Sequence, residues 1–199
     1  MSATKFATYL KAGFARVLAL EYSTTLPVAA DGERAVAQGD AGGRLMVSGK
    51  LHREITVVPV VSTAQYAAGD HVGGKITLAN ALRLPALSGK LMSITVNCKT
   101  VQTNTLMLAL FKADPSGTTF TDNAAAAIDA ADFAKLIGIF TLGAANSKMG
   151  MHTTFLLDNI NKAIQAAGST LYAALINTTG TPTLGSVSDI SVSIGIDQD

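Results

Sequence analysis

The chain has 199 residues, of which 48% are hydrophobic, and its formal net charge is +1. This composition suits one domain with a sizeable core plus an additional segment, and the scattered charges exclude the electrostatic footprint of a protein that binds nucleic acid or an anionic membrane. Its single cysteine, Cys98, excludes an internal disulfide and a four-cysteine zinc site. No apolar run approaches the roughly 20 residues that span a bilayer. We therefore expect protein partners, with no nucleic acid, no membrane and no small-molecule substrate.

Residues 1–50 are predicted to form an extended N-terminal arm, because turn residues alternate there with short strand-like pieces. Within the arm, residues 5–20 carry apolar side chains at three- and four-residue steps, as on one side of a helix. Such a segment can lie on a membrane surface, but one short stretch with three cations more often packs on a partner or on its own domain. The candidate arm contacts for assembly are Phe6, Leu10, Phe14 and Val17.

Short strand-like segments at regular spacing follow from Arg53 onward, which is typical of a sandwich or barrel. Capping signals predict two short connector helices, at residues 124–135 and 159–167. The predicted fold is therefore an all-β, eight-stranded, jelly-roll-like sandwich with two connector helices, over residues 51–199. The predicted strands are residues 54–61, 74–81, 91–100, 105–112, 136–142, 152–157, 170–177 and 189–196.

The residue pattern also predicts how three of these strands are placed. In residues 190–196, apolar side chains alternate with serine and glycine, which indicates a half-buried strand with one wet face. Residues 106–111 are apolar on both faces, so that strand is expected to be central or to meet another chain. Pro59 cannot donate to a ladder, so the first strand is expected at an edge or at a bulge.

The stretch GDHVGGKI, residues 69–76, has the spacing of a phosphate-binding P-loop at Gly69, Gly74 and Lys75. A P-loop continues with a hydroxyl that holds magnesium, and here that position is Ile76. The alternation that follows predicts a strand where a P-loop has a helix. We interpret the stretch as a glycine-rich turn before a strand, with Lys75 as the strand's solvated first residue.

No other pattern predicts chemistry. His52, His71 and His152 lie in separate segments without a second ligand at zinc spacing, so each is interpreted as a surface or turn residue. The aspartates lack the spacing of a calcium loop, no serine lies in G-x-S-x-G, and Cys98 shares an apolar face that predicts burial. A paired-carboxylate glycosidase stays formally open, because carboxylates meet in space. We assign no catalytic, cofactor-binding or metal-binding residue and predict that the protein is not an enzyme.

Several passages carry a distinctive text. They are VSTAQYAAGDHVGG at residues 61–74, FKADPSGTTFTDN at residues 111–123, and LYAALI, GTPT, SDI and GIDQD in residues 171–199. With these passages, about residues 54–199 resemble a family of tailed-bacteriophage virion proteins. Two shorter pieces upstream, LPVAADG and QGDAGGRLMV, resemble β-hairpin pieces of phage head and tail accessory proteins.

The resemblance implies a β-sandwich that assembles on the virion as a capsid cement, decoration or fibre-base protein, without catalytic residues or cofactors. We expect a homotrimer that binds the major capsid protein on the capsid surface and stabilises the head, after assembly in the host bacterial cytoplasm. The alternative is a tail, baseplate or fibre-associated module that binds host glycans. The absence of tryptophan weighs against that alternative, because sugar-binding sheets usually stack aromatic rings on sugars.

Overall fold

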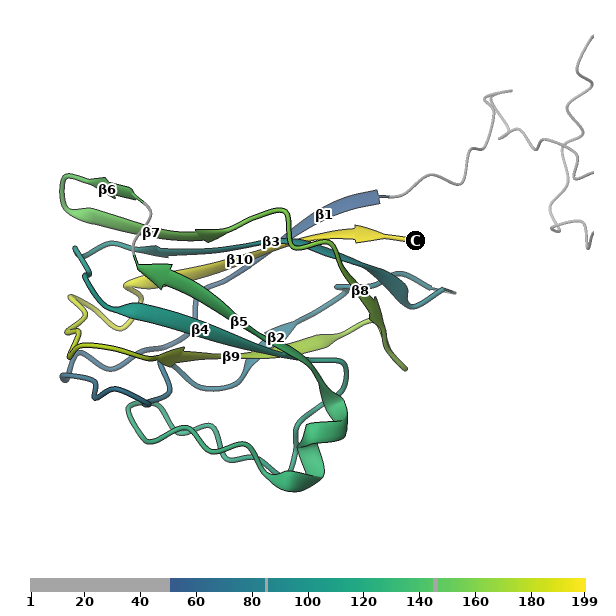
Figure 1. Ribbon diagram of the computed structural model, residues 1–199, viewed down its shortest axis with the longest axis horizontal. Coiled ribbons are helices and arrows are strands. Elements are labelled where there is room, and N and C mark those ends of the chain that lie inside the picture. Colours follow the sequence, from purple (N-terminus) through teal and green to yellow (C-terminus); the bar gives the residue numbers. More distant parts are fainter. Residues whose placement is uncertain (1–50, 85, 145–146) are drawn as a thin grey trace, which may run out of the picture. The chain divides into compact units, whose positions relative to one another are not determined.

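The computed structural model of the protein describes residues 51–84, 86–144 and 147–199. They form two antiparallel β-sheets that pack into a jelly-roll-like sandwich, which confirms the predicted fold class (Figure 1). The predicted arm lies outside the described residues, so the division into an arm and a domain stays a prediction.

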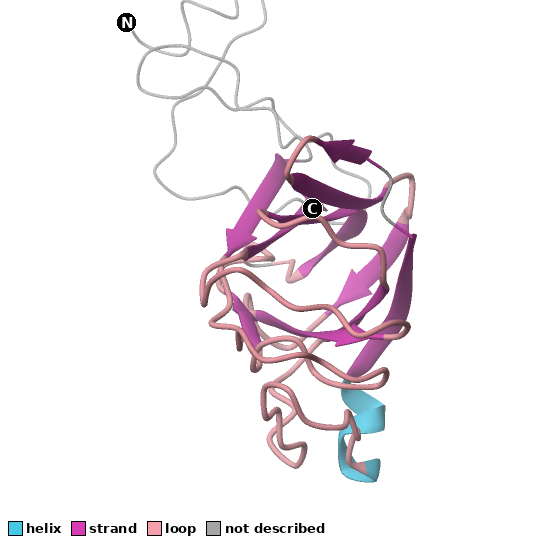
Figure 2. Ribbon diagram, turned by 90° about the vertical axis from the view of Figure 1, so that its left-hand side faces the viewer, coloured by secondary structure: helices cyan, strands magenta, loops and turns pink. Residues whose placement is uncertain are grey.

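The larger sheet has six strands in the order β1-β10-β3-β7-β6, with β8 paired to the first part of β3. Its strands are β1 (Leu51–Val57), β10 (Ile190–Gln198), β3 (Ser88–Cys98), β7 (His152–Leu157), β6 (Ser147–Met149) and β8 (Lys162–Gln165). The smaller sheet has the order β2-β9-β4-β5, and Figure 2 shows the sandwich from the side. Its strands are β2 (Ile76–Leu78), β9 (Leu171–Asn177), β4 (Thr105–Phe111) and β5 (Leu136–Ala144).

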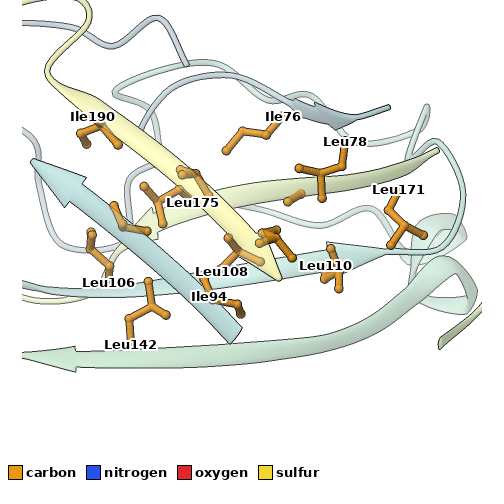
Figure 3. Close-up of a cluster of buried hydrophobic side chains, with 14 of the residues drawn as sticks. Ile76, Leu78, Ile94, Leu106, Leu108, Leu110, Leu142, Leu171, Leu175 and Ile190 are labelled. Carbon is orange, nitrogen blue, oxygen red and sulfur yellow. The ribbon is translucent and has the colours of Figure 1, made fainter. Parts of the chain in front are cut away.

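The core lies between the two sheets and is built from the inward-facing residues of each strand. Ile194 of β10 is fully buried and pairs with Ile55 on one side and Ile94 on the other. Leu108 of β4 and Leu175 of β9 stand opposite each other in the facing sheet, and both are fully buried (Figure 3). Burial of each such side chain contributes roughly 1.5–3 kcal/mol, so the core supplies most of the driving force for folding.

The predicted placements of β1 and β4 are confirmed. β1 is the end strand of the larger sheet and stops at Val57, two residues before Pro59. β4 lies between β9 and β5 and buries both faces at its end, from Leu108 to Phe111.

The prediction that one face of β10 is exposed to solvent is wrong at the middle of the strand. Ser193 is only 8% exposed and Gly195 is buried. Side chains of the flanking strands cover them: Thr56 Oγ1 lies 2.7 Å from Ser193 Oγ, and the ring of His52 lies over Gly195. A central strand is covered by its neighbours even on its outer face, which the sequence of one strand does not reveal.

Both predicted connector helices need correction. In the first, only Ala130–Lys135 is helical, as a 3-10 helix capped by Asp129. In the second, Asn159 and Asn161 have positive φ values of 55° and 50°, which interrupt a helix. Residues Lys162–Gln165 then form β8, because they pair with the start of β3. The structure therefore has two strands, β6 and β8, that the sequence did not predict.

Candidate functional site

The P-loop-like stretch forms a turn before β2, as predicted. Gly69 and Gly73 have φ values of +94° and +77°, which non-glycine residues rarely adopt. The amide of Gly73 donates to Asp122 Oδ1 at 2.6 Å, so it does not face a phosphate. Lys75 is exposed, as predicted, but it lies one residue before β2 and is not its first residue. Its Nζ donates to Asp114 Oδ1 at 2.6 Å.

The aspartates of the long segment between β4 and β5 hold loops together. Asp122 accepts from Tyr66 Oη at 2.8 Å as well as from Gly73. Asp132 is buried, accepts from the amide and hydroxyl of Thr118 at 2.7 Å each, and its pKa is lowered chiefly by the hydrogen bond from Lys135. Among the described residues, no three His, Cys, Asp or Glu side chains gather in a way that could hold a metal ion.

The three histidines differ in burial. The interpretation as surface or turn residues is wrong for His71, which is buried. His52 Nδ1 lies 2.8 Å from Asp197 Oδ1, and His152 Nδ1 lies 2.8 Å from the carbonyl oxygen of Lys99, both at exposed positions. His71 is 1% exposed, and neither of its ring nitrogens has a hydrogen-bond partner among the described residues. Burial lowers its pKa, although the carboxylates of Asp70 and Asp122 oppose this shift.

Cys98 is buried, as predicted, and its burial raises the pKa of its thiol to about 12. At neutral pH it is therefore a thiol with little nucleophilic character.

No helix in the described ranges is both long and apolar enough to cross a membrane.

A groove of about 450 Å³ crosses one end of the larger sheet, where β1 and β3 end and β7 and β10 begin. Its lining includes Val58, Asn97, Lys99, His152 and Ser188, which come from four separate segments of the chain. The amide of Lys99 donates to the carbonyl oxygen of Asp189 at 2.9 Å, and His152 binds the carbonyl oxygen of Lys99. Backbone pairing therefore fixes the segments that form the groove.

Exposed apolar side chains lie on the connecting segments that form this groove or adjoin it. Val58 lines it, and the other four lie within two residues of a lining residue, in connecting segments between strands. These five residues are half of the exposed large hydrophobic side chains in the described part of the chain. Backbone contacts also join their segments, since the amide of Val61 donates to the carbonyl oxygen of Val187 at 3.1 Å. We name this set the apolar rim: Val58 (53% exposed), Val60 (75%), Val101 (47%), Met151 (78%) and Val187 (58%).

The apolar rim consists of valine and methionine side chains, which offer apolar contact area and no titratable or nucleophilic group. Clustered apolar side chains on a protein surface mark interaction sites, whereas single ones are ordinary. The sequence analysis missed the rim because its residues are far apart in the chain and resemble ordinary strand residues. The only sequence signal for the rim is that a valine or methionine lies in each connecting segment at this end of the larger sheet. The predicted arm contacts Phe6, Leu10, Phe14 and Val17 lie outside the described residues.

No family model and no curated protein matches this chain. Among solved structures, a crystal structure of the T13 particle of infectious bursal disease virus is similar over 86% of this chain and 35% of that chain, with a TM-score of 0.36 and 14% identity. The VP2 subviral particle of the same virus is similar over 86% of this chain and 41% of that chain, with a TM-score of 0.34 and 14% identity. Desmodium yellow mottle tymovirus is similar over 93% and 95% of the two chains, with a TM-score of 0.24 and 9% identity.

These solved structures are viral particles or viruses, and the chain spans less than half the length of the infectious bursal disease virus chains. At such low TM-scores and identities, the similarities carry no weight for the function of this protein. The fold is a jelly-roll-like β-sandwich, and one end of its larger sheet carries a groove with exposed apolar side chains on the adjoining segments.

Proposed function

We propose that this protein is a structural component of a tailed-phage virion that binds the capsid exterior as an oligomeric cement or decoration protein and stabilises the head. The observation that supports this proposal is the apolar rim, whose residues lie in connecting segments at one end of the larger sheet. The resemblance of residues 54–199 to phage virion proteins supports the phage assignment, and the rim supplies a surface for the attachment.

Attachment through the apolar rim works by burial. A valine or methionine side chain that passes from full exposure to full burial contributes roughly 1.5–3 kcal/mol. The rim side chains are 47% to 78% exposed, so covering all of them contributes several kcal/mol. The polar side chains of the groove, such as Asn97 and Ser188, supply hydrogen bonds that fix orientation. Repeated over a shell, such contacts resist internal pressure without covalent links.

The arm contributes the second part of the proposal. Residues 1–50 reach across neighbouring subunits, with Phe6, Leu10, Phe14 and Val17 as the contacts. Fully extended, an arm of this length spans at most roughly 165–180 Å, so it can pass well beyond the sandwich to which it belongs. The partners are the major capsid protein and further copies of this chain, in a homotrimer.

The test measures binding of the purified full chain to undecorated capsids by co-sedimentation. Val60→Asp places a charge in the apolar rim and is expected to weaken binding at least about tenfold, or ~1.4 kcal/mol. Leu84→Asp is the matched control, because Leu84 is 74% exposed against 75% for Val60 and lies outside the rim, in the loop between β2 and β3. The rim is not the attachment site if the two variants bind equally well.

The arm is tested in the same assay. Replacing Phe6, Leu10, Phe14 and Val17 together by serine in the full chain is expected to reduce capsid binding, because it removes the apolar side of the segment and keeps its charges. Unchanged affinity would show that the arm is not an anchor. If the parent chain ignores capsids and binds host glycans on an array, the tail or fibre alternative replaces this proposal.

A further inference from the structure

β1 has a free edge. It is the end strand of the larger sheet, and within the described ranges it pairs only with β10 (Figure 1). The end strands β2 and β6 have three residues each, and β5 lies against β7. β1 is seven residues long, and on its free side the unpaired backbone amides and carbonyls form a template for another strand.

We propose that the free edge of β1 pairs with β1 of a second copy of this chain, about a two-fold axis that passes through Ile55. A two-fold axis perpendicular to the sheet makes the two strands antiparallel and sets side chains of the same face opposite each other. This self-association goes beyond capsid binding. It joins copies in pairs and is separate from the homotrimer proposed above.

The charges on β1 select the register. An axis at Glu54 pairs all seven residues but sets Glu54 opposite Glu54, and an axis at Arg53 sets Arg53 opposite Arg53. Like charges directly opposite each other destabilise a strand pair. An axis at Ile55 sets Ile55 against itself, Arg53 opposite Val57 and Glu54 opposite Thr56. It is the longest register of this strand without a like-charged pair.

The same register covers apolar surface at both ends of the paired strands. Leu51 is 51% exposed and Val58 is 53% exposed in the single chain. With the axis at Ile55 and the pairing continued two residues past the end of β1, Leu51 comes opposite Pro59 of the second copy, and His52 comes opposite its Val58. In the pair, Val58 is therefore covered by the second copy, and the other four residues of the apolar rim are left for the capsid. Because of the two-fold symmetry, each of these contacts occurs twice.

A cysteine substitution tests the position of the axis in the full chain. Directly opposite residues have Cα atoms about 4.5–5.5 Å apart, within the range of a disulfide, whereas the two Thr56 residues are beyond about 7 Å in this register. Ile55→Cys is therefore expected to give a covalent dimer under mild oxidation. Thr56→Cys, at a more exposed position, is expected to stay uncrosslinked. The parent is the background control, since its only thiol, Cys98, is buried.

Charge variants at Thr56 test the pairing without a new thiol. Thr56→Lys faces Glu54 of the second copy and is expected to tighten dimerisation about threefold, whereas Thr56→Glu is expected to weaken it about threefold. Both variants lose the contact with Ser193 equally, so this loss cancels in their comparison. Sedimentation equilibrium without capsids measures the dimerisation constants.

If Thr56→Cys crosslinks at least as fast as Ile55→Cys, the proposed register is wrong. If neither variant crosslinks, the proposed pairing of β1 with β1 is wrong. The pairing would also be overturned if Thr56→Lys and Thr56→Glu had equal dimerisation constants, or if Thr56→Glu dimerised more tightly than Thr56→Lys. A chain that fails these tests and still binds capsids refutes only the β1 pairing. A chain that dimerises as expected and ignores capsids refutes only the proposed function.

Discussion

Tyr66 Oη donates a 2.8 Å hydrogen bond to Asp122 Oδ1, which joins the loop before β2 to the long segment between β4 and β5. The Tyr66 ring is fully buried, and the same Asp122 oxygen accepts from the amide of Gly73. Burial is the largest cause that raises the pKa of the Tyr66 hydroxyl well above its usual value, so this group stays a donor at all physiological pH values.

Tyr66→Phe is expected to lower the free energy of unfolding by about 1–3 kcal/mol, because it removes the hydrogen bond that the buried Tyr66 side chain donates to the partly buried carboxylate of Asp122. Urea unfolding at pH 7 measures the change. Tyr172→Phe is the matched control, since the Tyr172 ring is only partly buried and lies beneath Lys75 Nζ at 5.5 Å. We expect about 0.5 kcal/mol or less for this control. Equal losses in both variants would contradict a special role for the Tyr66 hydrogen bond.

Because His71 is buried, we expect the free energy of unfolding to decrease at acid pH. Its folded-state pKa is lowered by burial below the ordinary value of 6.5, so the unfolded chain binds a proton at a higher pH than the folded chain does. The resulting contribution to stability is complete above pH 6.5 and is lost as the pH falls from 6.5 toward the folded-state pKa. Asp70 and Asp122 reduce the shift without reversing its direction.

His71→Leu removes this proton-binding group and keeps an apolar side chain beside Phe120, whose ring centroid lies 5.4 Å from that of His71. The parent is expected to lose more stability than the variant between pH 7 and pH 5. Urea unfolding at several pH values measures both profiles. Parallel profiles would show that His71 does not couple protonation to folding.

Leu108→Ala is expected to cost about 2–5 kcal/mol, because Leu108 is fully buried between the sheets and its removal leaves a cavity. Ile139→Ala in the neighbouring strand β5 is the matched control, since Ile139 is 49% exposed. We expect about 1 kcal/mol or less for it. A Leu108→Ala cost as small as that of the control would contradict the described position of the core.

Gly89→Ala is expected to destabilise the protein by about 1–3 kcal/mol, because an added Cβ would lie 2.5 Å from the carbonyl oxygen of Asp197 in the adjacent strand. Gly168→Ala is the control, since a Cβ there meets no atom within 4 Å. It is expected to leave stability unchanged or raise it by about 0.4–1 kcal/mol. Thermal unfolding of both variants measures the difference, and equal effects would contradict the close approach of β3 and β10 at Gly89.

The sequence analysis predicted the fold class because the period of two is a local property of each strand. Pro59 marked the edge strand, and the apolar run in β4 marked a central one. The helix predicted at residues 159–167 failed because its i, i+3, i+4 pattern competes with pairing to β3, a contact that is distant in sequence. Positive φ values at Asn159 and Asn161 are incompatible with a continuous helix there.

The candidate surface was beyond sequence analysis for a related reason. Val60, Val101 and Met151 resemble core residues by type, and only the tertiary fold leaves them exposed around one groove. The buried position of His71 was missed because a histidine in a glycine-rich turn is usually solvated. The absence of calcium-loop spacing among the aspartates agrees with their contacts, since Asp129 caps the 3-10 helix and Asp122 accepts from Gly73.

The most direct test of the central proposal is sedimentation velocity of the purified full chain, alone and mixed with undecorated capsids. Capsid attachment predicts that the protein moves with the capsids to saturation and, alone, sediments as a discrete oligomer. A discrete oligomer that leaves capsids undecorated would contradict the proposed function and favour a position on the tail.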